Sequence, residues 1–132
     1  MTDYTAYFDE VIQAHEAIER WFAVKEEEAA LERLLARFSP RFTMVTALGR
    51  VLDFEALRVL FQMAGGKKSG FRIELGELHG MALHERGATV SYREQQTDAS
   101  GLQTDRRSTV VFEKTESGRV IWRHLHETFC QG

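Results

Sequence analysis

Three short segments of the same design divide the second half of the chain into four runs of strand-forming residues. Each has two ordinary residues followed by a glycine: Glu85-Arg86-Gly87, Ala99-Ser100-Gly101 and Glu116-Ser117-Gly118. A three-residue hairpin loop needs a type I turn and then a residue with positive φ, which is usually glycine. The pattern therefore predicts a four-stranded antiparallel meander. Its strands are expected over residues 71–84, 88–98, 102–114 and 119–129.

The loops also predict a register, and successive side chains of a strand point to opposite faces. The second loop places Glu94 opposite Arg106. The third loop places Ser108 opposite His126. One face of the sheet then has an apolar end, which carries Ala88, Val90, Tyr92, Val110, Phe112 and Trp122. The other end of the same face is polar and carries Glu94, Arg106, Ser108, His124, His126 and Thr128. We expect this inner face to pack against the helices.

The run over 71–84 changes the parity of its apolar residues part-way along. A bulge near Gly76 would reconcile its two halves and bend the sheet. The first loop places Gly80 opposite Tyr92, where the missing side chain leaves space beside the ring. A bent sheet, this gap and a helix across the opening together predict an internal pocket.

The first half of the chain is predicted to form three helices. Apolar residues and one histidine recur at spacings of three and four, as on one face of an amphipathic helix: Tyr4, Phe8, Val11, His15, Ile18 and Phe22. A second helix is expected from about Glu26 to Arg37, and a short strand over 41–49. A third helix begins after an Asp53 N-cap and ends at Gly65-Gly66.

Composition narrows the class of protein. The chain has 132 residues, 43% of them hydrophobic and 28% charged, which suits a single domain over residues 1–132. Its net charge of −3 favours neither nucleic acid nor an anionic membrane as a partner. The N-terminal MTDYTAYFDE lacks the features of a signal peptide, and Cys130, the single cysteine, cannot form an internal disulfide. These features predict a cytoplasmic location.

The order of these elements resembles the nuclear-transport-factor-2-like superfamily, which includes ketosteroid isomerase, scytalone dehydratase and polyketide cyclases of the SnoaL type. The resemblance extends from about Tyr4 to Phe129 and is greatest to small, uncharacterised bacterial members. It is carried by LLARFSPRFTMV, by Gly49 before the acidic helix start at Asp53, and by a final strand of the form Trp-basic-x-x-His. In this chain that form is Trp122, Arg123 and His126.

The resemblance implies an α+β fold of the cone-shaped, cystatin-like kind. Three N-terminal helices would pack on a bent antiparallel sheet, with a pocket between them. It also implies a homodimer built with the outer face of the sheet. No catalytic set of the superfamily maps onto this sequence, so the site has to be argued from the residues.

The polar end of the inner face is the candidate site. In the enzymatic interpretation, a cofactor-independent isomerase, cyclase or dehydratase acts on a small apolar substrate, with His124 or His126 as base and Glu94 orienting a histidine. The candidate ligand-binding residues are His15, Tyr92, Arg106, Ser108, Trp122 and Thr128. Each also has a structural interpretation: His15 as a core histidine, Glu94 with Arg106 as a cross-strand ion pair, the aromatic residues as core.

Two other classes of function remain open. One is a non-catalytic ligand-binding or dimerisation module with the same pocket. The other is a metal site, since the His-x-His spacing of His124 and His126 puts two imidazoles on one side of a strand, and His15 or Glu94 would complete the set. The expected partners are a small molecule and a second copy of the chain, with no cofactor and no bound metal in the preferred interpretation.

Overall fold

The helical half of the chain follows its local sequence signals. In the computed structural model, which describes residues 3–131, it forms α1 (Thr5–Ala23), α2 (Glu28–Leu35) and α3 (Phe54–Ala64). The Asp53 carboxylate accepts a hydrogen bond from the backbone N–H of Ala56 at 2.9 Å, so the predicted N-cap of α3 is confirmed. α2 is shorter than predicted, because Glu26 and Glu27 lie outside it and its last turn tightens before β1.

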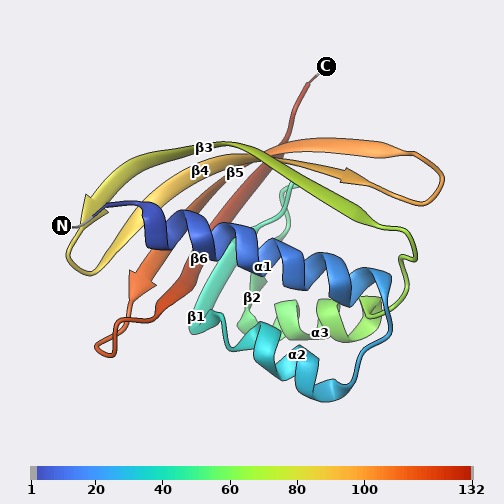
Figure 1. Cartoon of the computed structure of the whole chain (residues 1–132), viewed down its shortest axis with the longest axis horizontal. Helices are drawn as coiled ribbons and strands as arrows, with labels where there is room; N and C mark the ends of the chain where they lie inside the picture. Colours follow the sequence, from blue (N-terminus) through green and yellow to red (C-terminus); the bar gives the residue numbers. More distant parts are fainter. Residues whose placement is uncertain (1–2, 132) are drawn as a thin grey trace.

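The strands form one sheet in the order β2-β1-β6-β5-β4-β3. Their bounds are β1 (Phe38–Val45), β2 (Val51–Asp53), β3 (Arg72–His84), β4 (Gly87–Thr97), β5 (Gln103–Lys114) and β6 (Val120–Phe129). The four-stranded meander is confirmed. The sheet as a whole is mixed and not antiparallel, because β1 pairs in parallel with β6. The α+β fold is confirmed, with α1 beneath the arch of the sheet and α2 and α3 near β1 and β2 (Figure 1).

The β3–β4 hairpin differs from its prediction. Its loop has two residues rather than three, since His84 pairs directly with Gly87. The β3–β4 pairing also has two register shifts, between Gly76 and His79 and between Gly80 and Ala82. The first of them confirms the predicted bulge near Gly76. Gly80 lies opposite Val90 and not Tyr92, and a Cβ built on it would come within 2.3 Å of the Tyr4 ring. The missing side chain therefore makes room for the ring of Tyr4, the residue before α1.

The β5–β6 hairpin begins in the predicted register and leaves it at a bulge. Phe112 faces Trp122 as expected, but the next residue, Val111, faces His124, so that Arg123 is the extra residue of β6. The physical reason is burial: Trp122 and Leu125 are 2% and 8% exposed, yet they are three residues apart. Strict alternation cannot bury both, and one extra residue can.

The bulge reverses the faces of the last six residues of β6. The prediction that His124, His126 and Thr128 lie on the inner face is wrong, because these side chains point to the outer face. Leu125 and Glu127, predicted on the outer face, are buried on the inner one. The β4–β5 register carries no such shift, and the predicted pairs of Glu94 with Arg106 and Tyr92 with Ser108 are confirmed.

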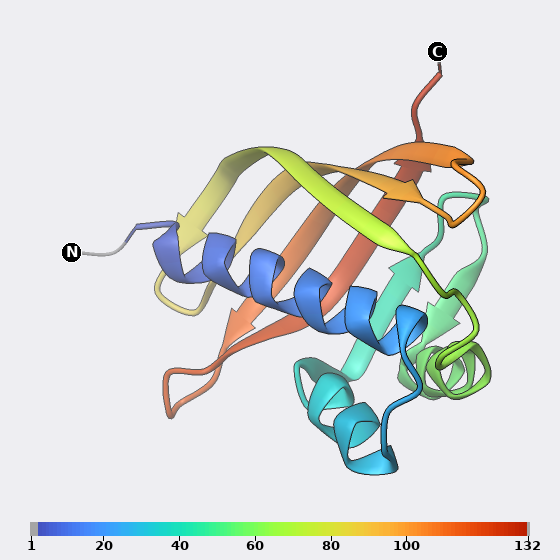
Figure 2. The same cartoon turned by 45° about the vertical axis from the view of Figure 1, so that its right-hand side comes forward.

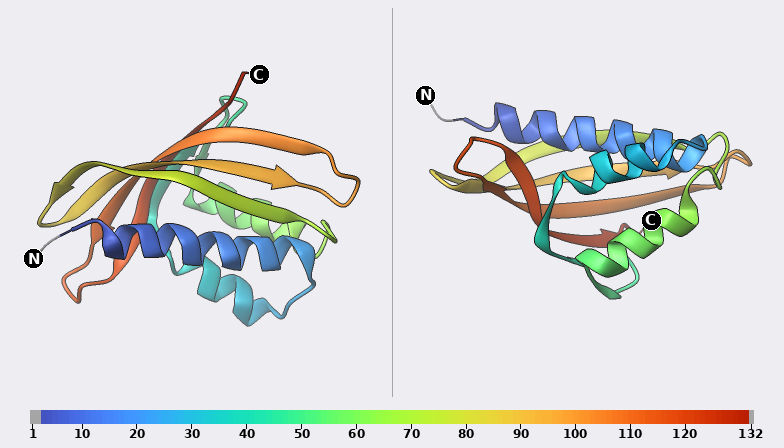
Figure 3. Two further views of the ribbon diagram at one scale, coloured as in Figure 1. Left: turned by 45° about the horizontal axis from the view of Figure 1, so that its top comes forward. Right: turned by 90° about the horizontal axis from the view of Figure 1, so that it is seen from below.

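The core lies between the bent sheet and the helices (Figure 2). Trp122 and Tyr92 are the largest side chains that are almost completely buried, and the Trp122 ring contacts those of Phe38 and Phe112. Seen from below, the three helices lie across the opening of the arched sheet (Figure 3). No helix within residues 3–131 is long and apolar enough to cross a membrane. Association of two copies through the outer face stays a prediction.

The hairpin loops that contain Gly101 and Gly118 have a backbone conformation that substitution can test. Gly101 and Gly118 have φ of +87° and +89°, and a Cβ at either position would meet open space. Gly101→Ala or Gly118→Ala is expected to lower the free energy of unfolding by about 1 kcal/mol through backbone strain alone. Gly76→Ala is the matched control, since its Cβ also meets open space and its φ is not positive. Equal stability of all three variants in chemical denaturation would contradict the loop assignment.

Candidate functional site

A cavity of about 270 Å³ lies between the sheet and the helices. Its walls are mostly apolar and come from α1, β1, β2, α3 and β6: Ile18, Phe22, Phe38, Phe42, Met44, Leu52, Leu57, Leu60, Phe61 and Leu125. We call this space the inner cavity. Its size and apolar walls suit a small organic molecule of one or two rings.

One end of the inner cavity is polar, although it is deeply buried. The side chains that line this polar end are His15 from α1, Glu94 and Gln96 from β4, Arg106 from β5 and Glu127 from β6. Their positions follow from the β4–β5 register and from the bulge, which together place these three strands' polar residues on the inner face.

A continuous chain of hydrogen bonds joins the five side chains. His15 Nε2 lies 3.2 Å from Glu94 Oε1, and Gln96 Nε2 donates to Glu94 Oε2 at 2.7 Å. Arg106 Nη2 donates to Gln96 Oε1 at 3.2 Å, and Arg106 Nη1 donates to Glu127 Oε1 at 3.3 Å. The two carboxylates therefore belong to one network, with a cation beside each.

The surroundings of His15 favour its positively charged form. Its Nδ1 lies 2.7 Å from the Val11 carbonyl oxygen and its Nε2 faces the Glu94 carboxylate, so both ring nitrogens face acceptors. A neutral imidazole has one N–H and satisfies only one of them. Burial lowers the pKa of His15, but the charge and hydrogen bond of Glu94 outweigh it and raise this pKa overall. Burial likewise raises the pKa of Glu94, and His15 then lowers it below its usual value.

The pKa of Glu127 is raised, so this carboxyl group keeps its proton to a higher pH than an ordinary glutamate does. Burial and the nearby charge of Glu94 raise the pKa of Glu127, and Arg106 offsets only part of the rise. Two carboxylates in one buried site thus have pKa values shifted in opposite directions. Such a pair separates roles: one group stays ionised while the other exchanges protons.

Arg106 Nε, next to this network, is buried and has no hydrogen-bond partner among the described residues. The Tyr92 hydroxyl and Ser108 Oγ are buried beside each other. Ser108 faces Tyr92 on one side and Glu127 on the other, and the Tyr92 ring lies edge-on to His15 at 5.2 Å. Burial raises the pKa of Tyr92 well above its usual range, so its hydroxyl keeps its proton.

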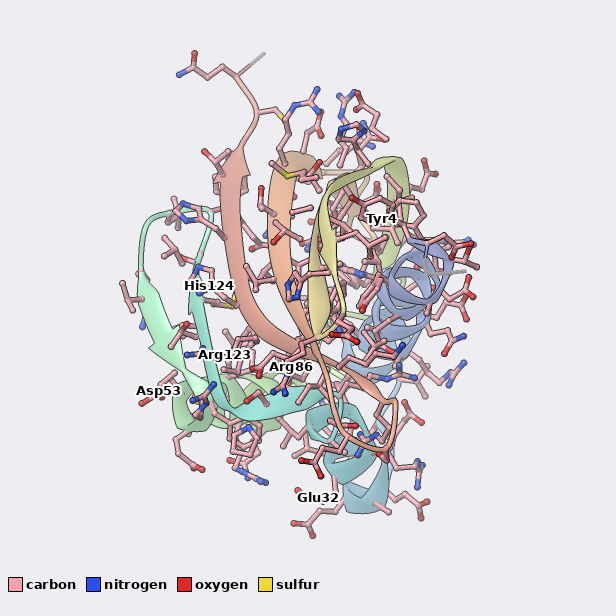
Figure 4. All side chains as sticks on the ribbon, turned by 90° about the vertical axis from the view of Figure 1, so that its left-hand side faces the viewer. Tyr4, Glu32, Asp53, Arg86, Arg123 and His124 are labelled. Atoms are coloured by element: carbon pink, nitrogen blue, oxygen red, sulfur yellow. The ribbon has the colours of Figure 1, made fainter. Side chains whose placement is uncertain are left out.

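The structure brings together only part of the predicted site. His15, Glu94 and Arg106 line the inner cavity, while Tyr92, Ser108 and Trp122 are buried on the inner face behind it. His124, His126 and Thr128 lie on the outer face and are separated from that cavity by the sheet. Figure 4 labels His124, beside β1, where its Nδ1 lies 2.8 Å from Thr43 Oγ1. Partial burial and then the neighbouring His126 lower the pKa of His124.

The mixed metal set that the sequence leaves open as an alternative is not brought together. His124 and His126 are on the opposite face of the sheet from His15 and Glu94. Within residues 3–131 no group of three or more His, Cys, Asp or Glu side chains is arranged to hold a metal ion.

Sequence reasoning missed Glu127 and Gln96. The position of Glu127 could have been found from Trp122 and Leu125, two large apolar residues three apart. Both are buried on the same face, which strict alternation along a strand does not allow. A bulge that buries both also turns Glu127 inward, where its carboxylate accepts a hydrogen bond from Arg106. Gln96 follows Glu94 at a spacing of two and shares its face in a strand.

Comparisons with known proteins agree with this fold. The chain is 47% identical to an NTF2-like protein of unknown function from Pseudomonas aeruginosa, over 96% of this chain and 99% of that one, with a TM-score of 0.90. A CamKII hub homology domain from Chlamydomonas reinhardtii is 19% identical over 98% and 100% of the chains (TM-score 0.75). A ketosteroid isomerase-like protein from Erwinia carotovora atroseptica is 11% identical over 100% of both chains (TM-score 0.70). No family model and no curated protein sequence matches the chain.

The chain therefore belongs to the NTF2-like superfamily. The predicted family is confirmed. The two more distant structures establish the fold alone, and the 47% identical relative is itself of unknown function.

Proposed function

We propose that the inner cavity binds a small, mostly apolar molecule with one carbonyl or hydroxyl group, and that the polar end carries out acid–base chemistry on it without a cofactor. The observation that carries this proposal is the position of Glu127. Its carboxylate has a raised pKa, lines the end of an apolar cavity and lies in a network with a second, ionised carboxylate. The fold shared with a ketosteroid isomerase-like protein supports this class of reaction.

The chemistry is proton transfer next to a carbonyl group. Glu127 accepts a proton from the carbon beside the carbonyl, the C–H bond breaks, and the electron pair moves to the carbonyl oxygen as an enolate. Arg106, which lines the cavity, donates a guanidinium N–H to that oxygen. Glu127 then returns the proton to the same carbon or another, which gives exchange or isomerisation. His15 and Glu94 act as a fixed ion pair that holds the network in place.

Deuterium exchange into 1-tetralone, a bicyclic ketone, tests the proposal. The wild-type protein in D₂O is expected to accelerate exchange of the protons beside the carbonyl, as followed by NMR. Glu127→Gln keeps the shape and removes the base, so we expect its rate to fall by at least about 100-fold. Glu74→Gln, on the exposed part of β3, and His126→Gln, on the outer face, are controls that should keep the wild-type rate.

The same experiment separates the alternatives. Exchange that survives in Glu127→Gln and disappears in His126→Gln would contradict the proposed base. Binding of 2-naphthol or 1-tetralone without any exchange would identify a non-catalytic ligand-binding module. Absence of both binding and exchange would leave a dimerisation module, for which sedimentation velocity should give the mass of two chains.

A further inference from the structure

A surface cleft lies beside the inner cavity. The cleft, of about 590 Å³, lies between the turn that follows α3 and the loop that joins β4 to β5. Lys68 and Gln96 line both the cleft and the inner cavity, so the two spaces meet at these side chains. Gln96 also belongs to the polar network, whereas Lys68 lies at the apolar side of the junction.

The backbone on the Lys68 side of the cleft is held in place. The N–H groups of Gly66 and Lys68 donate to the carbonyl oxygens of Trp21 and Phe22 at the end of α1, at 2.9 and 2.8 Å. Gly70 adopts a φ of +80°, and a Cβ built on it would lie 3.0 Å from the Ala99 Cβ across the cleft. The walls of the cleft are therefore close together at Gly70 and are fixed by main-chain contacts.

Lys68 is fixed by aromatic contacts and not by a carboxylate. Its Nζ lies 4.9 Å from the centroid of the Phe22 ring and 5.1 Å from that of Phe71. No carboxylate within residues 3–131 forms an ion pair with Lys67 or Lys68. The acidic side chain of the cleft is Asp98, whose Oδ1 accepts from Ser100 and from the Leu102 N–H. The cleft thus has two positively charged lysines and one carboxylate, which already accepts hydrogen bonds from its own loop.

The charges of the inner cavity, by contrast, are balanced. His15 and Arg106 face Glu94 and Glu127, so an ionised ligand group has no counter-charge to gain there. A negative group on a ligand would find its complement outside, at the lysines of the cleft.

We propose that the ligand is an aromatic or fused-ring acid, whose uncharged polar group reaches Glu127 and whose anionic group lies at Lys67 and Lys68. This inference rests on the proposed function, because it places the apolar body of the ligand in the inner cavity. The anionic group, a carboxylate or a phosphate, selects the ligand and orients it, and takes no part in proton transfer.

Two fluorescent probes that differ by one carboxylate test the inference. 2-Naphthol has a hydroxyl only, and 6-hydroxy-2-naphthoate has a carboxylate at the opposite end of the same ring system. We expect wild-type protein at low salt to bind the acid about fivefold more tightly than the naphthol, and high salt to remove most of this gain. The Lys67→Met and Lys68→Met double variant keeps the apolar stems and is expected to lose the gain while binding 2-naphthol normally. Lys114→Met, on β5 away from the cleft, should change neither affinity.

The outcomes separate this inference from the proposed function. Equal affinity for the two probes, or a gain that persists in the double variant, would overturn the anionic-ligand inference while the inner cavity still binds 2-naphthol. If neither probe binds, the proposed function fails, and this inference fails with it.

Discussion

Replacing His15 by alanine is expected to lower the free energy of unfolding by about 3–5 kcal/mol, because it leaves the Glu94 carboxylate buried without its cation. His15 and Glu94 are 5% and 3% exposed, so bulk water screens the unpaired carboxylate poorly. The loss should appear in chemical denaturation at slightly acidic to neutral pH. Ile12→Ala, on the exposed side of the same helix, is the control for helix effects and should cost far less.

A double-mutant cycle shows that the loss comes from the ion pair. Glu94→Gln removes the charge that His15→Ala would leave without a partner. The two substitutions together should therefore cost clearly less than the sum of the single losses. Additive losses would mean that His15 and Glu94 stabilise the fold independently, and the assignment of a buried ion pair would then be wrong.

The pH dependence of stability gives the pair a second signature. The pKa of His15 is raised from its usual 6.5, so its contribution is fully present below pH 6.5 and is lost as the pH rises through the folded-state value. The pKa of Glu94 is lowered from 4.5, so its contribution is present above pH 4.5 and is lost as the pH falls through the folded-state value. The pKa of Glu127 is raised from 4.5, so its contribution is fully present below pH 4.5 and is lost as the pH rises through its folded-state value. His15→Ala should therefore flatten the alkaline decline, and an unchanged decline would contradict the assignment.

Trp122→Ala is expected to cost about 3–5 kcal/mol of unfolding free energy, because it opens a large cavity at the centre of the core. The Trp122 ring lies 4.9 Å from that of Phe112, 5.8 Å from that of Phe38 and 5.9 Å from that of His15. Its Nε1 also donates to Glu10 Oε2 at 3.0 Å. The large side chain thus joins β6 to β5, β1 and α1.

Trp122→Phe is the matched variant for this prediction. It keeps an aromatic ring in the core and loses the hydrogen bond to Glu10, so it should cost much less than alanine. A melting temperature of Trp122→Ala close to that of the wild type would show that this residue is not at the centre of the core. It would also remove the reason for the bulge at Arg123, since burial of Trp122 is one half of that argument.

The parts of the fold that the sequence predicts are those set by local chemistry. Asp53 caps a helix because its carboxylate reaches a free N–H, and Gly101 and Gly118 adopt positive φ because other residues resist it. The β4–β5 register follows from its loop without a shift, and it places Glu94 and Arg106 on the inner face. These residues, with His15 from the helical periodicity, are the predicted site residues that line the inner cavity.

The parts that the sequence did not predict depend on competition between distant residues. The bulge at Arg123 arises because Trp122 and Leu125 both need the core, and one inserted residue then reverses the faces of His126 and Glu127. The parallel pairing of β1 with β6 joins the two halves of the chain, and no turn signal specifies it. The alternation of residues along β6 predicts that His124 and His126 lie in the site. The packing of Trp122 and Leu125 places Glu127 there instead.

The central claim is that the functional site is the polar end of the inner cavity, with His15 charged there and the histidines of β6 outside it. An NMR spectrum of the histidine ring nitrogens at neutral pH, recorded before and after addition of 2-naphthol, tests this claim most directly. We predict that both ring nitrogens of His15 are protonated and that their signals shift when the probe binds, while His124 and His126 do not respond. A neutral, unresponsive His15 together with probe-dependent shifts of His124 and His126 would contradict it.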